Sequence, residues 1–285
     1  MMASLHLKSY AKVNLRLEIL KRREDGYHEL RTIFQKISLH DILRFSLKKE
    51  KGISIVADHP KLPLGKKNLV YAATQSMFKV CGYRGGIHIE IEKKIPLGAG
   101  LGGGSSNAAT TLMALNQLLD TNLSQKELMK MGLEIGADVP FFFLKGAATG
   151  LGIGERLKEE ELPILWYVLI YPNFEVSTRW AYQHFVLTNQ QFHINLHRFL
   201  KTPQEISRIL FNHLEEVVSK RYPEISLMKE YLLSAGALGA LMTGSGPTVF
   251  GLFPEARSAA RAYERVKRLA DGKGWVVFKA RSITV

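Results

Sequence analysis

The stretch that decides the fold runs from Pro96 to Asn107 and reads Pro-Leu-Gly-Ala-Gly-Leu-Gly-Gly-Gly-Ser-Ser-Asn. Glycines have no side chains, so successive backbone N–H groups can converge on an anion. A helix that starts behind such a run adds the partial positive charge of its N-terminus. We therefore interpret the run as a phosphate-binding loop, in preference to a flexible turn in which Ser or Asn caps a helix.

The loop lies between a predicted strand and a predicted helix. Ile87 to Glu92 alternates apolar and polar residues, which is typical of a strand with one buried face and antiparallel neighbours. Behind the loop, apolar residues recur at helical spacing from Ala108 to Leu119. Ser124 with Glu127 then predicts a capping box at the start of a second helix, which Gly136 ends.

Two widespread phosphate-binding patterns fit this loop poorly. Gly98, Gly100 and Gly103 satisfy G-x-G-x-x-G, but the dinucleotide-binding unit needs a buried parallel strand running into the first glycine. Here the preceding strand alternates and Pro96 intervenes. A Walker-type loop is excluded, because Gly104 stands at the position that requires lysine. The loop therefore belongs to neither class.

Length and composition restrict the fold class. The chain has 285 residues, of which 46% are hydrophobic and 23% charged. Such a chain buries a large core, which excludes disordered and fibrous proteins, and at roughly 150 residues per domain it indicates one large or two modest domains. A polar break from Glu155 to Glu161 favours two. We predict two α+β domains, residues 1–158 and 159–285.

The remaining elements are predicted from shorter patterns. Leu5 to Leu20 reads as a strand that enters a turn at Asp25-Gly26, and the glycines from Gly146 to Gly154 punctuate a hairpin. The second half adds helical patterns around Pro203 to Lys220 and Pro254 to Ala270, and strands at Thr248 to Phe253 and Trp275 to Ala280.

Charge and hydropathy bear on partners and location. The chain has 39 Lys and Arg against 26 Asp and Glu, a formal net charge of +13. The basic clusters are scattered instead of forming a stripe interleaved with aromatics, so an RNA-binding module is only a second hypothesis. No apolar run approaches the roughly 20 residues that cross a bilayer. One cysteine, Cys81, forms no intrachain disulfide. We expect a cytoplasmic protein without nucleic-acid or membrane partners.

Four separated segments resemble motifs of the GHMP kinase superfamily. They are Ala11 to Leu15 followed by Arg23 to Leu30, the glycine loop with Ala108 and Ala109, Gly136 to Phe142, and Met242 to Phe250. Their order and spacing agree over nearly the whole chain. The resemblance implies a two-domain fold, with an N-terminal domain like the second domain of ribosomal protein S5 and a C-terminal ferredoxin-like α/β domain.

The segment Asp25 to His28 resembles one branch of this family more than the others. That resemblance implies ATP-dependent phosphorylation of the 2-hydroxyl of a cytidine diphosphate-linked methylerythritol, in the non-mevalonate isoprenoid precursor pathway. It also implies Mg²⁺, carried as MgATP, small-molecule partners, and a monomer or homodimer. Mevalonate, homoserine or a sugar stay open as alternative acceptors within the family.

The resemblance also implies the catalytic residues. Asp138 matches the aspartate that accepts the proton of the acceptor hydroxyl. Lys12 matches the lysine that pairs with it and neutralises developing phosphate charge. Without the resemblance, Asp138 reads as the N-cap of a turn before Pro140, and Lys12 as a solvated strand residue.

Other matched residues are implied in binding. Asn14 would position the acceptor, Tyr27 and Tyr182 would stack on the cytosine ring, and His28 would read its edge. Asn68 and Lys94 match the nucleotide side, against the alternatives of a helix cap and a solvated lysine. The implied ATP-binding residues of the loop are Pro96, Gly98, Gly100, Leu101, Gly102, Gly103, Gly104, Ser105 and Ser106. A second glycine turn, Gly244-Ser245-Gly246, would close over the phosphates. The metal ligands are not predicted.

Overall fold

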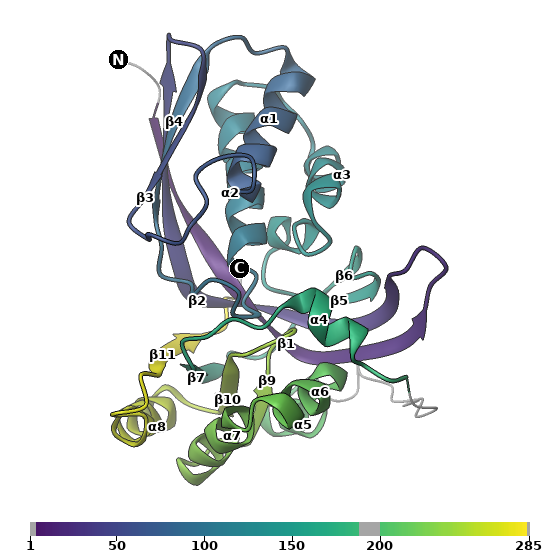
Figure 1. The fold of residues 1–285 in the computed structure, drawn as a ribbon, viewed down its shortest axis with the longest axis vertical. Coiled ribbons are helices and arrows are strands. Elements are labelled where there is room, and N and C mark those ends of the chain that lie inside the picture. The colour runs from purple at the N-terminus through teal and green to yellow at the C-terminus, as the bar shows by residue number, and fades with distance from the viewer. Residues whose placement is uncertain (1–3, 188–199, 284–285) are drawn as a thin grey trace. The chain divides into compact units, whose positions relative to one another are not determined.

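Two long strands, β1 (Ser4–Arg22) and β2 (His28–Lys48), begin the fold in this computed structural model, which describes residues 4–187 and 200–283 (Figure 1). The chain forms two compact units that interleave along the sequence. Unit 1 holds residues 1–11, 40–97 and 102–144, and unit 2 holds residues 12–39, 98–101 and 145–285. Both long strands contribute residues to each unit, whereas the predicted domains, 1–158 and 159–285, are consecutive segments.

The sheet of unit 1 is built around β4 (Gly86–Glu92), the strand predicted from alternation. β4 pairs antiparallel with β2 from Ile42 to Lys48, and parallel with β3 (Gly52–Ala57). The expectation of antiparallel neighbours is therefore right for β2 and wrong for β3. The reason is connectivity: helix α1 (Leu69–Cys81) lies between β3 and β4 along the chain, and such a crossover returns the chain in the same direction.

Helices cover one face of this sheet (Figure 1). They are α1, α2 (Gly103–Leu118) and α3 (Gln125–Ile135), followed by the 3₁₀ turn η1 (Pro140–Phe143). The predicted helices behind the glycine loop are confirmed. Ala108, Leu112 and Leu115 of α2 are completely buried, and the capping box of Ser124 and Glu127 is formed. Burial of this apolar face holds α2 in the core of unit 1, where it contacts α1, α3 and η1.

The first sheet of unit 2 uses the other halves of β1 and β2. β5 (Ala147–Gly152) pairs antiparallel with both β2 and β6 (Arg156–Glu160), which confirms the predicted glycine-punctuated hairpin. The helical pattern predicted from Pro203 to Lys220 is interrupted. It forms α5 (Pro203–Arg208), the short strand β8 (Phe211–Asn212) parallel to β1, and α6 (His213–Arg221). Asn212 ends the pattern because its side chain caps α6.

The second sheet of unit 2 has four strands in the order β11-β7-β10-β9, each antiparallel to its neighbours. They are β7 (Trp166–Tyr171), β9 (Gly239–Met242), β10 (Val249–Phe253) and β11 (Val276–Arg281). Helix α7 (Glu224–Ser234) precedes β9 and α8 (Ala256–Leu269) joins β10 to β11. In chain order the strands lie 4-1-3-2, which confirms the ferredoxin-like arrangement that the family resemblance implied.

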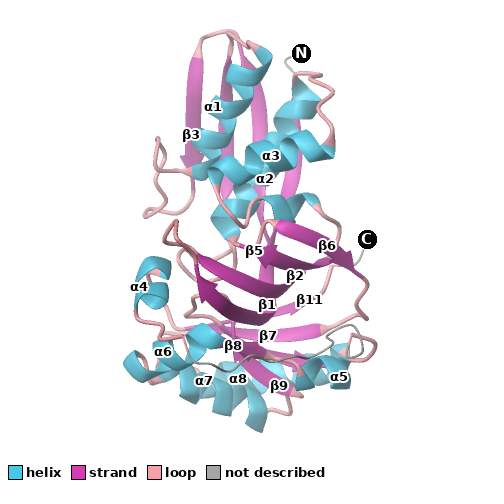
Figure 2. Ribbon diagram, turned by 90° about the vertical axis from the view of Figure 1, so that its right-hand side faces the viewer, coloured by secondary structure: helices cyan, strands magenta, loops and turns pink. Residues whose placement is uncertain are grey.

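Three helices close the core of unit 2. Figure 2 shows α6, α7 and α8 along one face of the second sheet. They bury Val218, Met228 and Val266 against Val168 and Ile170 of β7. Full burial of each such side chain contributes about 1.5–3 kcal/mol. This core fixes the ends of β9 and β10, between which the second glycine turn lies.

Candidate functional site

The glycine loop alternates between left-handed glycines and buried anchors. Gly98, Gly100 and Gly102 have φ angles of 58°, 74° and 69°, a region that side-chain-bearing residues rarely adopt. Ala99 and Leu101, which interrupt the glycine run in the sequence, are 2% and 1% exposed. Their side chains anchor the loop in the core, and Gly100 between them is half-buried.

Helix α2 of unit 1 starts without a side-chain cap. Its N-cap is Gly102, and no side chain of the described residues bonds there. The alternative interpretation, a Ser or Asn cap, is wrong. Ser106 is buried, and its hydroxyl accepts a hydrogen bond of 2.7 Å from Ser9, whereas Gly104 is exposed. The N–H groups of an uncapped first turn, together with the helix dipole, favour an anion at this end of the helix.

Lys12 and Asn14, in unit 2, are buried polar residues instead of solvated ones. Lys12 is 4% exposed and its Nζ donates to Asn14 Oδ1 at 2.6 Å. Asn14 Nδ2 in turn donates to Thr32 Oγ1 at 2.8 Å. The backbone N–H of Lys12 donates to the carbonyl of Leu101 at 3.0 Å. The lysine is thus tied to the first half of the glycine loop.

The second glycine turn packs against the first, backbone to backbone. Gly244 and Gly246 also have positive φ angles, 58° and 79°. A β-carbon placed on Gly100 would lie 2.2 Å from the carbonyl oxygen of Thr243, and one placed on Gly244 would lie 3.3 Å from Nζ of Lys12. Only glycine allows this approach. Within unit 2, Lys12 and the two glycine turns therefore converge on one place.

Neutral hydrogen bonds hold the second turn. Thr243 Oγ1 accepts the backbone N–H of Asn14 at 2.9 Å and bonds the carbonyl of Gly100 at 3.3 Å. Asn212 Nδ2 donates to the carbonyls of Met242 and Gly244, at 2.7 and 2.8 Å. Sequence reasoning missed Thr243 and Asn212 as supporting residues, since their partners lie far away along the chain.

Asp138 lies in unit 1, half-buried, between α3 and η1. The N-cap of η1 is Val139, so the alternative interpretation of Asp138 as that cap is wrong. A turn in which the N–H of Val139 donates to the carbonyl of Gly136 at 3.0 Å shapes the segment. The capping requirement of the next element therefore does not account for an aspartate here.

The residues predicted for the cytosine end lie in unit 2, where β1 turns into β2. Tyr27 is 61% exposed, and its N–H donates to the Asp25 carboxylate at 3.1 Å. The rings of His28 and Tyr182, the latter on α4 (Thr178–Gln183), have centroids 5.4 Å apart and planes inclined by 30°. Burial, and then the nearby Arg22, lowers the pKa of His28, so its ring is neutral at pH 7.

The two residues predicted on the adenine side, Asn68 and Lys94, differ in burial and in their partners. Asn68 caps α1: its Oδ1 accepts the N–H of Val70 at 2.9 Å and its Nδ2 donates to the carbonyl of Pro63 at 2.6 Å. Lys94 is exposed and pairs with Glu92 at 2.8 Å. The lysine that lies against the loop is its neighbour Lys93, which sequence reasoning missed. A β-carbon on Gly103 would lie 3.0 Å from Lys93 Nζ.

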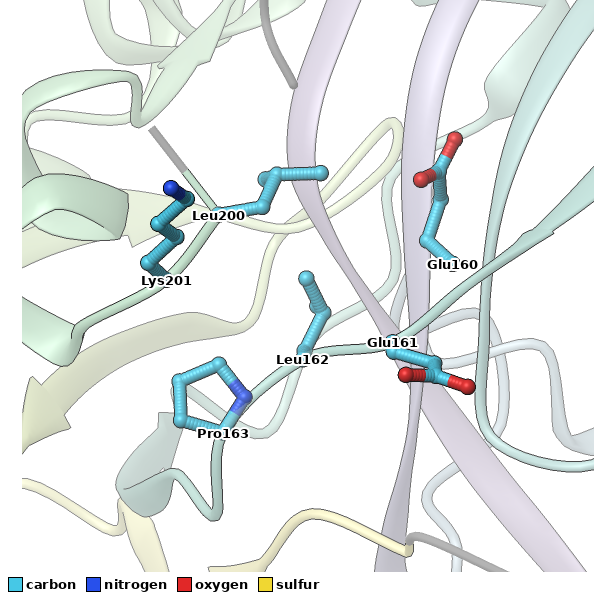
Figure 3. A pocket seen from close by; sticks show the side chains of 6 residues that line it. All are labelled: Glu160, Glu161, Leu162, Pro163, Leu200 and Lys201. Atoms are coloured by element: carbon cyan, nitrogen blue, oxygen red, sulfur yellow. The ribbon is translucent and has the colours of Figure 1, made fainter. Parts of the chain in front are cut away.

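Figure 3 shows a separate hollow in unit 2. It is lined by Glu160, Glu161, Leu162, Pro163, Leu200 and Lys201. None of the predicted site residues lines it. Within residues 4–187 and 200–283, no three His, Cys, Asp or Glu side chains gather as a metal site would require. None of the helices described is both long and apolar enough to cross a bilayer.

Comparison with protein families places matches on both halves of the chain. The N terminal domain of GHMP kinases matches residues 68–146, and the C terminal domain of GHMP kinases matches residues 194–271. These matches lie on either side of the predicted boundary at 158/159. Together they cover more than half of the chain.

Relatives of known name match over the full length. The chain is 46% identical to the 4-diphosphocytidyl-2-C-methyl-D-erythritol kinase of Syntrophotalea carbinolica, over 96% of this chain and 97% of that one. It is 44% identical to the enzyme of the same name from Geobacter sulfurreducens, over 99% and 100%. A crystal structure of 4-(cytidine 5'-diphospho)-2C-methyl-D-erythritol kinase superposes with a TM-score of 0.85 at 32% identity, covering 99% and 100%. A homoserine kinase from Cytophaga hutchinsonii shares the fold, with a TM-score of 0.78 at 24% identity, covering 100% and 96%.

Proposed function

Because the chain belongs to the GHMP kinases, and among them to the 4-diphosphocytidyl-2-C-methyl-D-erythritol kinases, we infer that it transfers the γ-phosphoryl group of ATP to the 2-hydroxyl of 4-diphosphocytidyl-2-C-methyl-D-erythritol. This reaction belongs to the non-mevalonate pathway to isoprenoid precursors. The observation that carries the inference from the geometry is the convergence of Lys12 with two left-handed glycine turns in unit 2.

We propose that the glycine loop binds the phosphates of ATP. The residues proposed are Pro96, Gly98, Gly100, Leu101, Gly102, Gly103, Gly104, Ser105 and Ser106. The uncapped start of α2 and the left-handed glycines support this, because both expose backbone N–H groups and favour negative charge. In this proposal ATP would enter as MgATP, in which the metal would offset part of the phosphate charge. We assign no residue of the chain to the metal.

We propose that Lys12 and Asp138 carry the chemistry. Asp138 accepts the proton of the acceptor hydroxyl as the γ-phosphoryl group arrives, and the Lys12 ammonium stabilises the charge that develops on the transferring group. The burial of Lys12 supports its part, since a charge held in a region poor in water acts more strongly than a solvated one. Phosphoryl transfer needs little more from a protein than alignment and charge neutralisation.

We propose that Asn14 positions the acceptor and that Tyr27, His28 and Tyr182 bind its cytosine. The contact between the rings of His28 and Tyr182 supports a place where a flat base is recognised, with His28 hydrogen bonding to its edge. The exposure of Tyr27 leaves its face accessible for stacking.

Asn68 and Lys94 are proposed on the adenine side. The start of α1 supports this for Asn68, because its neighbour Leu69 lies 3.6 Å from where a β-carbon on Gly104 would be. Asn68 would act there by shaping the backbone, since its Oδ1 caps α1 and its Nδ2 bonds the carbonyl of Pro63 in the preceding loop. A cytoplasmic location, a monomeric or homodimeric state, and the division at 158/159 remain predictions.

The first experiment presents the purified protein with MgATP and one acceptor at a time. We expect turnover with 4-diphosphocytidyl-2-C-methyl-D-erythritol and none with mevalonate, homoserine or galactose, measured as ADP release and by mass of the product. If the protein turned over only one of the other acceptors, the acceptor that we infer would be wrong, and the enzyme would belong to a different branch of the family. If the protein bound no ATP and instead bound RNA with an affinity that falls steeply with salt, the RNA-binding hypothesis would be favoured.

The proposed base is tested by Asp138→Asn. The amide cannot accept the proton, so we expect kcat to fall by about a thousandfold while ATP still binds. Isothermal titration with a non-hydrolysable ATP analogue provides the binding control. Turnover close to that of the parent protein would reject Asp138 as the base.

A further inference from the structure

One buried carboxylate in unit 1 holds together three parts of the chain that meet at the glycine loop. Asp41, on β2, is completely buried and accepts four hydrogen bonds. Its Oδ1 accepts the backbone N–H groups of Lys94 and Ile95, both at 2.8 Å. Its Oδ2 accepts Nζ of Lys93 at 2.6 Å and Nδ2 of Asn107 at 2.9 Å. None of these bonds is part of a sheet or helix ladder.

The four donors come from the two flanks of the loop. Lys93, Lys94 and Ile95 immediately precede Pro96, where the chain enters the glycine run, and Asn107 lies in the first turns of α2. Asp41 therefore fixes the entry of the loop and the helix behind it to the same strand. Asn107 extends the network, because its Nδ2 also donates to Ser9 at 2.9 Å, and Ser9 donates to Ser106.

Lys93 is the charge partner of this carboxylate. Its ammonium is 1% exposed and also donates to the carbonyl of Ile95 at 2.7 Å. Burial lowers the pKa of Lys93, and the charge of Asp41 opposes that shift. The carboxylate of Asp41 offsets the cost of burying this ammonium. A β-carbon on Gly103 would lie 2.9 Å from Ile95 Cγ2 and 3.0 Å from Lys93 Nζ, so Lys93 and Ile95 both pack closely against the first residue of α2.

We propose that Asp41 is a positioning residue for ATP: it sets the geometry of the phosphate loop without touching the nucleotide. The proposal rests on the proposed function, in which this loop binds the phosphates. A cradle of N–H groups binds phosphate well only when the groups are already aimed at one point, because ordering them during binding costs affinity. Four bonds from one buried carboxylate provide that order.

Replacement of the carboxylate by an amide disturbs both flanks. Asparagine has one acceptor oxygen, and its NH₂ would face two of the former donors, whichever way it turns. One flank of the loop would then lose its anchor, and Lys93 would lose its counter-charge. Acceptor binding in unit 2 does not depend on these bonds, so the effect falls on ATP.

The test compares Asp41→Asn with Asp58→Asn. Asp58 is exposed and accepts the backbone N–H of Lys93 at 2.8 Å, so the control makes the same chemical change on the same segment and removes none of the four bonds to Asp41. Dissociation constants of a non-hydrolysable ATP analogue and of 4-diphosphocytidyl-2-C-methyl-D-erythritol are measured separately by titration. We expect Asp41→Asn to weaken nucleotide binding by roughly tenfold or more, and acceptor binding by less than about twofold. Asp58→Asn leaves both unchanged.

Two further variants keep the proposal testable if Asp41→Asn does not fold. If Asp41→Asn does not fold, Asn107→Ser removes one of the four bonds and leaves the buried ion pair, and we expect a smaller, again nucleotide-specific, loss. The double variant Asp41→Asn with Lys93→Met removes both charges. It should recover part of the thermal stability lost in Asp41→Asn, but not the nucleotide affinity.

Two results would overturn the proposal. One is nucleotide affinity within about twofold of the parent in a folded Asp41→Asn protein; the other is an equal loss for nucleotide and acceptor, which marks a general structural role. Failure of the proposed function looks different, because the parent protein itself would then not bind the ATP analogue.

Discussion

Two regions of unit 2 share the strands β1 and β2 but are built in opposite ways. At the end proposed for phosphoryl transfer, Lys12 and Asn14 are 4% and 1% exposed and are bonded to each other. At the end proposed for cytosine, Tyr27 is 61% exposed, and His28 contacts Tyr182 through its ring. The first region is a closed network of polar atoms, whereas the second is an open aromatic surface.

The difference indicates how each region tolerates change. A buried polar atom that loses its partner costs about 1–3 kcal/mol, so in the closed region one substitution disturbs several neighbours. An aromatic surface contributes through contact area and stacking, which depend less on exact position. We expect changes in the closed region to lower kcat and changes in the open region to raise KM for the acceptor.

The largest effect is expected for Lys12→Met. Methionine keeps most of the length of the side chain but removes the charge and the hydrogen bond from Lys12 Nζ to Asn14 Oδ1. We predict a loss in kcat of about a hundredfold to a thousandfold, with less than about threefold change in KM for the acceptor. Steady-state kinetics with both substrates varied measures this. If Lys12→Met raised only the KM for the acceptor and left kcat unchanged, the closed region would behave like the open one, and the comparison between them would be wrong.

Gly100→Ala tests the contact between the two glycine turns. Its β-carbon would meet the carbonyl oxygen of Thr243 at 2.2 Å, and its φ of 74° is strained for alanine. We predict a loss in kcat/KM for ATP of about a hundredfold, because the turns must separate. Gly82→Ala is the matched control, since Gly82 has a φ of 64° and no atom within 4 Å of its β-carbon position. Equal losses would mean that strain alone, and not the close approach, matters.

Tyr182→Leu tests the open region. Leucine retains apolar contact with the core of unit 2, against which Tyr182 packs, but removes the ring that contacts His28. Stacking of an aromatic ring on a base is worth about 1–3 kcal/mol, so we predict a rise in acceptor KM of about tenfold with kcat nearly unchanged. Tyr263→Leu on α8 is the control. A fall in kcat for Tyr182→Leu, without a rise in KM, contradicts the assignment.

The smallest effect is expected from pH. The pKa of His28 is lowered, so the ring is neutral at pH 7 and gains its proton only as the pH falls below the usual value of about 6.5. We predict an acceptor KM that is constant from neutral to mildly alkaline pH and rises a few fold on acidification. In His28→Gln the KM should be higher at neutral pH and should lose this acid dependence. If the acceptor KM of His28→Gln still rose on acidification, the group that titrates would not be His28.

The glycine loop was predictable because its signal is local. The strand before it, the helix behind it and the capping box of α3 all follow from patterns within about ten residues. The same holds for α8, whose buried residues recur three and four positions apart. The sequence also shows that Ala99 and Leu101 interrupt the glycine run. It does not show that their side chains are buried and anchor the loop.

The supports of the site were not predictable, because their partners lie far apart in sequence. Lys93 and Lys94 look alike in the sequence, and Asp41, 52 residues before Lys93, decides which of them is buried. The hydroxyl of Thr243 reaches Asn14 across 229 residues. The parallel pairing of β3 likewise depends on where α1 returns the chain. Alternation gives the face of a strand but not the identity of its neighbours.

The interleaving of the two units has a consequence for engineering. Residues 12–39 of unit 2 precede most of unit 1 along the chain, residues 98–101 interrupt it, and residues 145–285 follow it. A single cut at any bond therefore leaves at least one fragment with parts of both units, so neither can be expressed alone by truncation. Circular permutants and split-reporter fusions of this enzyme should be designed around this order. New termini belong in exposed turns such as the one at Gly272 and Gly274.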